Sequence, residues 1–305
     1  ACSLLSPLTA ADAPAKLPSG FSVQHMDLSV DPRADFAKFA AGTWYKNFQM
    51  PADKSRFGAF DTLEQNNWAN VKAILEDLSS RTHPAGTLEQ KVGDYFAAAM
   101  DDAAIDAAGA KPLEPFLARV AAIASIDDLS RTVGEFRREG VGGGMFFLGV
   151  TADQKRSDFN ALYLFQGGTS LPSKDYYFAE PFAKVREQFK EHVAKMFVLL
   201  GDTPEAAAAG AATVLALETE MARHMKTPVE LRDRVANYNR MSFDELAALM
   251  PGFPIRQHIR DAGYADGIVD YVVVGQPKYL EGLNGLLASR PIDEWKTYLR
   301  YRLVS

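Results

Sequence analysis

Cysteine is almost absent from this sequence, since Cys2 is the single one in 305 residues. An internal disulfide is therefore excluded, and the fold has to be stabilised by packing alone. Basic residues form no block and the net charge is −6, so the charge pattern does not indicate a nucleic-acid partner. No run approaches roughly eighteen consecutive apolar residues, so we expect no membrane-spanning helix.

The sequence also lacks the common signatures of a catalytic centre. None of its histidines begins the pattern His-Glu-x-x-His, which places two zinc ligands and a base on one helix face. A Gly-x-Ser-x-Gly nucleophile elbow is missing, and Cys2 has no structured base beside it. We therefore expect no catalytic residue and no metal ligand set in this chain.

Glu220 and His224, one helical turn apart with Glu218 nearby, come closest to a metal-binding arrangement. Two such groups could contact a metal. An acid and a histidine at this spacing are far more often a solvated contact on a helix surface, which is the interpretation that we favour.

The residues that are present indicate an ordinary soluble globular protein. Hydrophobic residues make up 47% of the sequence and charged residues 24%. Apolar residues at spacings of three and four predict a mainly α-helical fold. The expected helices span residues 35–48, 61–78, 88–100, 112–124, 125–139, 181–200, 204–227, 277–289 and 292–303, with a further helix beginning at the capping pair Ser242 and Glu245.

Two short segments interrupt the helical spacing. Residues 145–150 and 161–166 are apolar or alternating, and they predict a small β-hairpin with a long loop. Residues 271–274 are a third strand candidate. The glycines at 142–144 precede a strand and no Lys-Ser/Thr follows them, so they are not a phosphate-binding loop.

Residues 1–26 are expected to be a flexible tether. Ala1-Cys2-Ser3 begins a stretch rich in Ala, Pro and Ser, which resembles the lipid-attachment junction of bacterial lipoproteins. The alternative is a free thiol at Cys2 in a disordered leader. The first interpretation predicts an extracytoplasmic protein that is periplasmic or held at the membrane by a lipid anchor.

Three stretches carry a specific combination of residues. In chain order they are Val30-Asp31-Pro32 through Arg56-Phe57-Gly58-Ala59-Phe60-Asp61-Thr62-Leu63, then Leu171-Pro172-Ser173-Lys174-Asp175-Tyr176-Tyr177, then Gln276-Pro277-Lys278-Tyr279-Leu280 followed by Asp293-Glu294-Trp295-Lys296. Together they resemble the amino-terminal region of the neprilysin-type (M13) zinc metallopeptidases. Each motif alone is a weak or moderate signal, whereas all three in the family's order across residues 27–303 are a specific one.

The resemblance implies a largely α-helical protein of two lobes. In this family a catalytic lobe carries zinc on His-Glu-x-x-His and a downstream Glu, and a second helical lobe closes over small peptides. This chain resembles the second, substrate-enclosing lobe, and residues 27–60 are expected to pack against the catalytic lobe. The expected partners are peptide substrates and a carboxy-terminal catalytic lobe or fragment, which would hold the zinc.

The resemblance also implies two substrate-binding residues. Arg56 matches the family arginine that binds the free carboxylate at the prime-side end of a substrate, and Asp61 matches the acid that orients it. A guanidinium fork suits a carboxylate because it can donate two parallel hydrogen bonds. Glu64 stands where the family often has a second arginine, which favours internal cleavage of peptides. Without the resemblance, Arg56 would be interpreted as a surface arginine paired with Asp53 or Asp61.

Other matched residues are expected to have structural roles. Trp44 and Phe60 are predicted to lie in the core. Asp175 is predicted to be a turn acid, and Tyr176 and Tyr177 to be aromatic side chains that bury a large area.

Three functional hypotheses follow. The leading one is the substrate-gating part of an M13-type zinc endopeptidase, inactive by itself. The second is a non-catalytic helical binding or scaffold protein related to this lobe, which should not expose a large apolar surface. The third is a nicked enzyme, in which this chain stays bound to a carboxy-terminal fragment.

Overall fold

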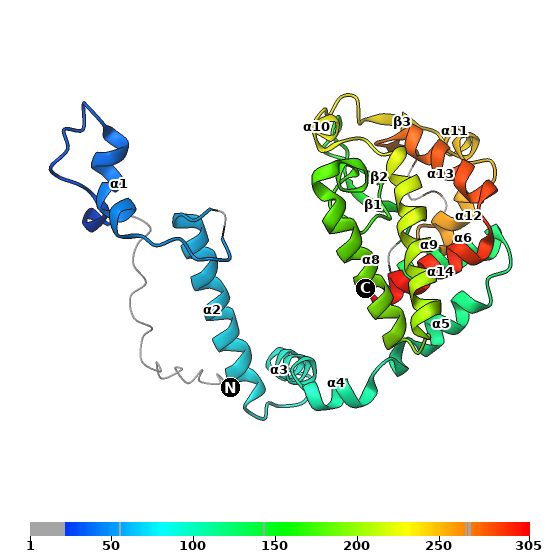
Figure 1. Cartoon of the computed structure of the whole chain (residues 1–305), viewed down its shortest axis with the longest axis horizontal. Coiled ribbons are helices and arrows are strands. Elements are labelled where there is room, and N and C mark those ends of the chain that lie inside the picture. Colours follow the sequence, from blue (N-terminus) through cyan, green and yellow to red (C-terminus); the bar gives the residue numbers. More distant parts are fainter. Residues whose placement is uncertain (1–21, 55, 143, 266, 268–269) are drawn as a thin grey trace, which may run out of the picture. The chain divides into compact units, whose positions relative to one another are not determined.

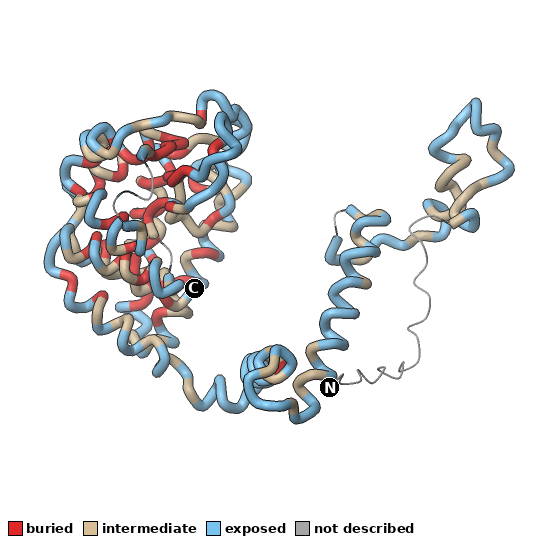
Figure 2. Tube along the Cα trace, turned by 180° about the vertical axis from the view of Figure 1, so that it is seen from behind, coloured by how far each residue is buried: buried red, intermediate tan, exposed pale blue. Residues whose placement is uncertain are grey.

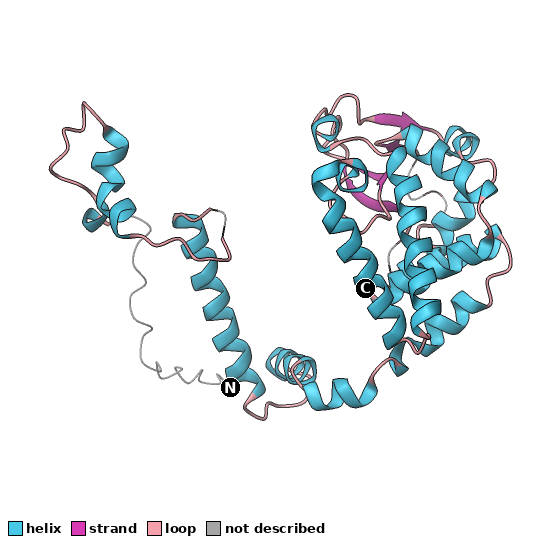
Figure 3. Ribbon diagram, viewed as in Figure 1, coloured by secondary structure: helices cyan, strands magenta, loops and turns pink. Residues whose placement is uncertain are grey.

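The computed structural model describes residues 22–54, 56–142, 144–265, 267 and 270–305. It divides into two compact units, residues 1–106 and 107–305. Cys2 and most of the predicted tether, residues 1–26, lie outside the described residues. The predicted fold class is confirmed, because both units are built mainly from helices and a small sheet lies in the second (Figure 1; Figure 3).

The three longer helices of the first unit form where the spacing of apolar residues predicts them, whereas the short helix Asp102–Ala108 was not predicted. The Asp35 carboxylate accepts a hydrogen bond from the Lys38 amide at 2.9 Å and so caps the first α-helix. Because it lacks a Cβ, Gly93 brings two helices close together, and a Cβ there would lie 2.6 Å from the Leu78 carbonyl oxygen. The elements of this unit are η1 (Val23–His25), α1 (Phe36–Asn47), α2 (Ala59–Ser79) and α3 (Leu88–Ala99), and α4 (Asp102–Ala108) crosses into the second unit.

The first unit has no buried hydrophobic side chain among its described residues, 22–54 and 56–106 (Figure 2). The prediction that Phe60 lies in the core is wrong: its side chain is 86% exposed, because nothing in this unit covers that face of α2. Trp68 on the same helix is 66% exposed. Trp44 is half-buried and stacks on Phe48 with ring centroids 4.5 Å apart. This unit therefore has no hydrophobic core of its own.

The longer helices of the second unit follow the predicted pattern, whereas the short helices Lys174–Phe178, Pro228–Leu231 and Ile255–Asp261 were not predicted. Ser242 and Glu245 form the predicted capping box, in which each side chain accepts a hydrogen bond from the other residue's amide. The predicted helix 204–227 ends earlier, at Arg223, and Thr227 then caps a separate short helix. The helices are η2 (Lys111–Leu113), α5 (Glu114–Ala121), α6 (Ile126–Glu139), α7 (Lys174–Phe178), η3 (Glu180–Phe182), α8 (Ala183–Leu199), α9 (Pro204–Arg223), α10 (Pro228–Leu231), α11 (Phe243–Leu249), α12 (Ile255–Asp261), α13 (Pro277–Ser289) and α14 (Ile292–Val304).

A small sheet lies within the second unit. The strands of the described part are β1 (Phe146–Ala152), β2 (Asn160–Gln166), β3 (Asn239–Met241) and β4 (Val272–Val274), in the order β1-β2-β4-β3. The predicted hairpin is the antiparallel β1–β2 pair, and the third candidate is β4, which lies parallel to β2. β3 was not predicted, because Asn-Arg-Met lacks the run of β-branched residues that marks β4.

The hairpin loop is fixed by one buried acid. The Asp153 carboxylate is 1% exposed and accepts hydrogen bonds from the hydroxyls of Tyr271 at 2.7 Å and Tyr238 at 2.9 Å. These bonds and two backbone amides hold the pKa of Asp153 below its usual value, although burial opposes the effect. The loop between β1 and β2 is therefore joined to both other strands.

The second unit buries its own hydrophobic core. One cluster surrounds Leu217, Tyr279, Trp295 and Tyr298, all fully buried, and it includes side chains of the sheet. A second cluster lies between α8 and α9 around Phe197. None of the described helices is long and apolar enough to cross a membrane.

Candidate functional site

Arg56 and Asp61 lie at the amino-terminal end of α2. Arg56 precedes the helix, Gly58 is its N-cap in an extended conformation, and Asp61 lies in the first turn. Both residues line an open hollow of about 630 Å³, which Phe60 and Glu64 also line. The structure thus places the two predicted substrate-binding residues on one wall. Their binding role stays a prediction.

The Arg56 side chain is exposed, and it forms no ion pair within the part of the chain that the structure describes. In particular, the surface pair with Asp53 or Asp61 is not formed there, and Asp53 instead lies 3.9 Å from Lys54. A guanidinium beside the first turn of a helix favours an anion, while the carboxylates of Asp61 and Glu64 reduce the local positive charge. This arrangement can bind a carboxylate.

The pair Glu220 and His224 does not form a metal site. Glu220 Oε1 lies 3.1 Å from Arg223 Nε, and the His224 ring lies against Gly282. No group of three or more His, Cys, Asp or Glu side chains is placed to hold a metal among the described residues. The zinc that the resemblance implies therefore has no ligand set in the described part of this chain.

Glu218, the sequence neighbour of that pair, is a buried hydrogen-bond acceptor. Its side chain is fully buried and accepts hydrogen bonds from the Tyr177 hydroxyl at 2.7 Å, the Ser170 hydroxyl at 2.7 Å and the Ser170 amide at 2.9 Å. Burial raises the pKa of Glu218, and the three donors and the charge of Arg302 partly oppose this. No local sequence signal distinguishes Glu218 from Glu220 on the same helix.

The residues of the motif that begins at Leu171 connect the end of the sheet to α9. The Tyr177 hydroxyl accepts a hydrogen bond from the Leu171 amide at 2.9 Å while it donates to Glu218. The Lys174 ammonium donates to the carbonyl oxygens of Arg223 at 3.0 Å and Met225 at 3.1 Å, which satisfies carbonyls at the end of α9. This motif is therefore structural, as expected. Asp175, which was predicted to be a turn acid, instead lies in the first turn of α7.

The motif that begins at Gln276 holds the start of the segment that follows β2, whereas the motif that begins at Leu171 lies at its end. Gln276 Oε1 accepts a hydrogen bond from the Gln166 amide at 2.8 Å. The buried Tyr279 hydroxyl lies 2.7 Å from the Met145 carbonyl oxygen and 2.6 Å from that of Gly167. These two motifs are far apart in sequence, and both hold the segment that follows β2.

The family model described as "Peptidase family M13" matches residues 32–305. The chain belongs to peptidase family M13. It matches the amino-terminal region of that family, which is homologous to zinc metalloendopeptidases.

Several M13 relatives are similar over most of this chain. It is 28% identical to an endothelin-converting enzyme homolog of Locusta migratoria over 86% of this chain and 38% of the relative. It is also 28% identical to human endothelin-converting enzyme 1, over 92% of this chain and 37% of the relative. The chain thus spans less than half the length of the curated relatives that it matches.

Solved structures show the same relationship. The zinc metalloprotease Zmp1 of Mycobacterium tuberculosis, in complex with an inhibitor, superposes with a TM-score of 0.82 and 32% identity, over 94% of this chain and 44% of that one. PepO of Lactobacillus rhamnosis gives a TM-score of 0.70 at 21% identity, which shows the shared fold, over 86% of this chain and 41% of that one.

Proposed function

We propose that this M13 chain is the substrate-gating part of a zinc endopeptidase that cleaves small peptides. The observation that carries the proposal is the family match over residues 32–305. The chain also spans only 37–44% of the length of the similar proteins. The zinc and the catalytic residues would belong to a carboxy-terminal part. These residues would contribute enclosure of the peptide and anchoring of a carboxylate.

The exposed apolar side chains of the first unit support the proposal that another polypeptide surface covers them. Phe60, Trp68 and Ile74 on α2 are 86%, 66% and 58% exposed, and no hydrophobic side chain of the described residues 22–54 and 56–106 is buried. Helices in proteins gain most of their stability from packing of an apolar face, and this face of α2 is exposed. We propose that residues 27–60 and this face of α2 pack against the catalytic part. The exposed surface also disfavours an independent scaffold protein.

A turnover assay tests this proposal. The purified 305-residue chain should not cleave an internally quenched peptide. The longer polypeptide that includes the sequence encoded after Ser305 should cleave it, lose activity with a zinc chelator and regain it when zinc is added. We also expect a His-Glu-x-x-His motif in the sequence encoded after Ser305.

Two results would contradict the proposal. One is peptide cleavage by the pure 305-residue chain that persists in chelator. The other is a longer polypeptide that binds zinc and cleaves folded proteins as readily as short peptides, since an enclosing lobe should admit only the latter. Mass spectrometry of the purified protein tests the nicked-enzyme alternative, because it would detect a second polypeptide.

A further inference from the structure

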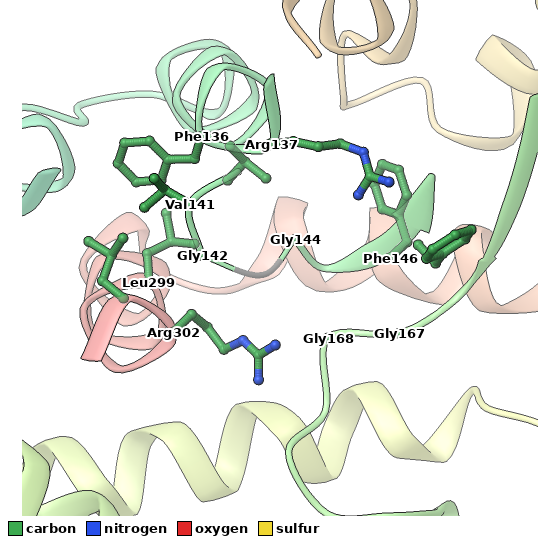
Figure 4. Close-up of a pocket in the computed structure, with 13 residues that line it drawn as sticks. Phe136, Arg137, Val141, Gly142, Gly144, Phe146, Gly167, Gly168, Leu299 and Arg302 are labelled. Carbon is green, nitrogen blue, oxygen red and sulfur yellow. The ribbon is translucent and has the colours of Figure 1, made fainter. Parts of the chain in front are cut away.

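A separate pocket of about 280 Å³ lies inside the second unit, between α6, α14 and the segment that follows β2 (Figure 4). Arg137 reaches it from α6 and Arg302 from α14, and the two guanidinium groups lie on different sides of the space. No carboxylate belongs to its described lining residues. The pocket therefore contains two cations and no built-in counter-ion.

The hydrogen-bonding capacity of Arg302 is only partly used by the protein. Its Nη1 donates to the Ser170 hydroxyl at 3.2 Å, and that hydroxyl in turn donates to Glu218. Its Nε is buried and has no hydrogen-bond partner within the described part of the chain. A buried donor without a partner is unfavourable, and a guanidinium fixed at one nitrogen is well placed to bind a planar anion.

Arg137 is also without an ionic partner among the described residues. Its guanidinium lies 5.5 Å from the centre of the Phe147 ring, which holds the side chain in place without neutralising its charge. Arg302 interacts electrostatically with Glu218, whose oxygens already accept three hydrogen bonds. Neither cation is therefore neutralised by a direct contact.

The apolar residues that line the pocket indicate which kind of ligand it fits. Val133, Phe136, Val141, Leu299 and Leu303 supply an apolar surface, and the volume is slightly below the roughly 300–1,000 Å³ of pockets for drug-sized ligands. An apolar wall beside two arginines fits a small molecule with one carboxylate and one apolar group. A phosphate, which is polar on all sides, would leave that wall unused.

We infer that this pocket binds a small carboxylate with an apolar side group, such as the carboxy-terminal residue of a peptide. Arg302 binds the carboxylate, Arg137 adds positive charge from the other side of the pocket, and the apolar wall contacts the side group. The inference does not depend on the proposed peptidase function, because all the residues that carry it lie in the second unit of this chain.

Calorimetric titration of the 305-residue chain with N-acetyl-L-phenylalanine tests the inference. Two ligand controls separate the contributions: the corresponding amide lacks the charge, and N-acetylglycine lacks the apolar group. Inorganic phosphate tests for a general anion site. We expect the acid to bind about ten- to a hundredfold more tightly than its amide, as for the loss of a hydrogen bond to a charged group.

Four variants locate the binding. Arg302→Gln and Arg137→Gln should each weaken the acid about tenfold or more, while Arg138→Gln, the exposed neighbour on α6, should not. The titrations are repeated in Arg56→Gln, which removes the other predicted carboxylate site, and loss of all binding in that variant would place the ligand at Arg56 and overturn the inference. Equal affinities for acid, amide and phosphate, or no binding of the acid, would also overturn it. Thermal unfolding of each variant identifies any that fail to fold, and Arg302→Lys then replaces Arg302→Gln.

Discussion

The Tyr177 hydroxyl donates a hydrogen bond to Glu218 Oε2 over 2.7 Å, and both groups are buried. This contact joins α7 to the middle of α9, across residues that lie 41 positions apart in the sequence. Burial beside the Glu218 charge raises the pKa of Tyr177 far above its usual value, so the hydroxyl stays protonated and remains a donor.

Tyr177→Phe should destabilise the second unit. It leaves the Leu171 amide without its acceptor and removes one of the three donors to Glu218, which should cost about 1–3 kcal/mol. Tyr176→Phe is the matched control, because its ring stacks on Phe182 and its hydroxyl forms no hydrogen bond with the described residues. Urea unfolding followed by circular dichroism measures both. Equal stability of the two variants would contradict this role of Tyr177.

Gly168→Ala should be more destabilising than Gly201→Ala. Both glycines have positive φ, +80° and +95°, which costs an alanine about 1–2 kcal/mol. A Cβ at Gly168 would also lie 2.8 Å from Met145 Cα and 2.9 Å from the Tyr298 hydroxyl oxygen, whereas nothing lies within 4 Å at Gly201. The clash should add about 1–3 kcal/mol. Thermal unfolding of the two variants should show the difference, and similar melting temperatures would refute it.

The buried His258 should make stability depend on pH. Its side chain is only 2% exposed, and its Nδ1 is 2.9 Å from the Ser130 carbonyl oxygen. Burial lowers the pKa of His258 to about 4. The unfolded chain, with a histidine pKa near 6.5, binds the proton first as the pH falls. Stability contributed by neutral His258 is therefore present above about pH 6.5 and is lost towards pH 4, by on the order of 3 kcal/mol.

His258→Asn provides the comparison for this effect. Asparagine can still donate to the Ser130 carbonyl, but it does not titrate. The difference in unfolding free energy between the wild type and the variant, measured by urea titration from pH 7 to pH 4.5, should shrink as the pH falls. A difference that stays constant would show that His258 does not titrate in this range.

The first unit should exchange its amide hydrogens much faster than the second. Its described residues bury no hydrophobic side chain, whereas Val214, Leu217 and Met221 on α9 are fully buried. In the 305-residue chain, hydrogen exchange followed by mass spectrometry should show α2 exchanging at least about tenfold faster than α9. Equal protection of the two helices would mean that α2 is already covered by another surface.

Arg56 should act on substrates with a free carboxy terminus. In the longer, active polypeptide we expect Arg56→Gln to raise KM about tenfold for a peptide whose free carboxylate lies near the cleavage site. The same peptide with an amidated carboxy terminus should be cleaved equally by both proteins. An identical loss for both peptides would show that Arg56 supports the fold instead of contacting the carboxylate.

Much of the fold could be predicted from local sequence. Helix bounds followed apolar spacing and capping residues, as with Asp35 before α1 and the box of Ser242 and Glu245. The two segments at residues 145–150 and 161–166 formed the predicted antiparallel pair. The core position assigned to Phe60 was wrong, because its apolar character gave no information about whether another element covers it.

The sequence by itself determined the longer helices, the β1–β2 hairpin and the family, because those depend on local spacing and on matched motifs. Tertiary structure alone decided the parallel pairing of β4 with β2, the burial of Glu218 against Tyr177, and the meeting of Arg137 with Arg302 around one pocket. Each of these joins residues distant in the chain. Such contacts depend on how whole elements pack, and no short stretch of sequence carries that information.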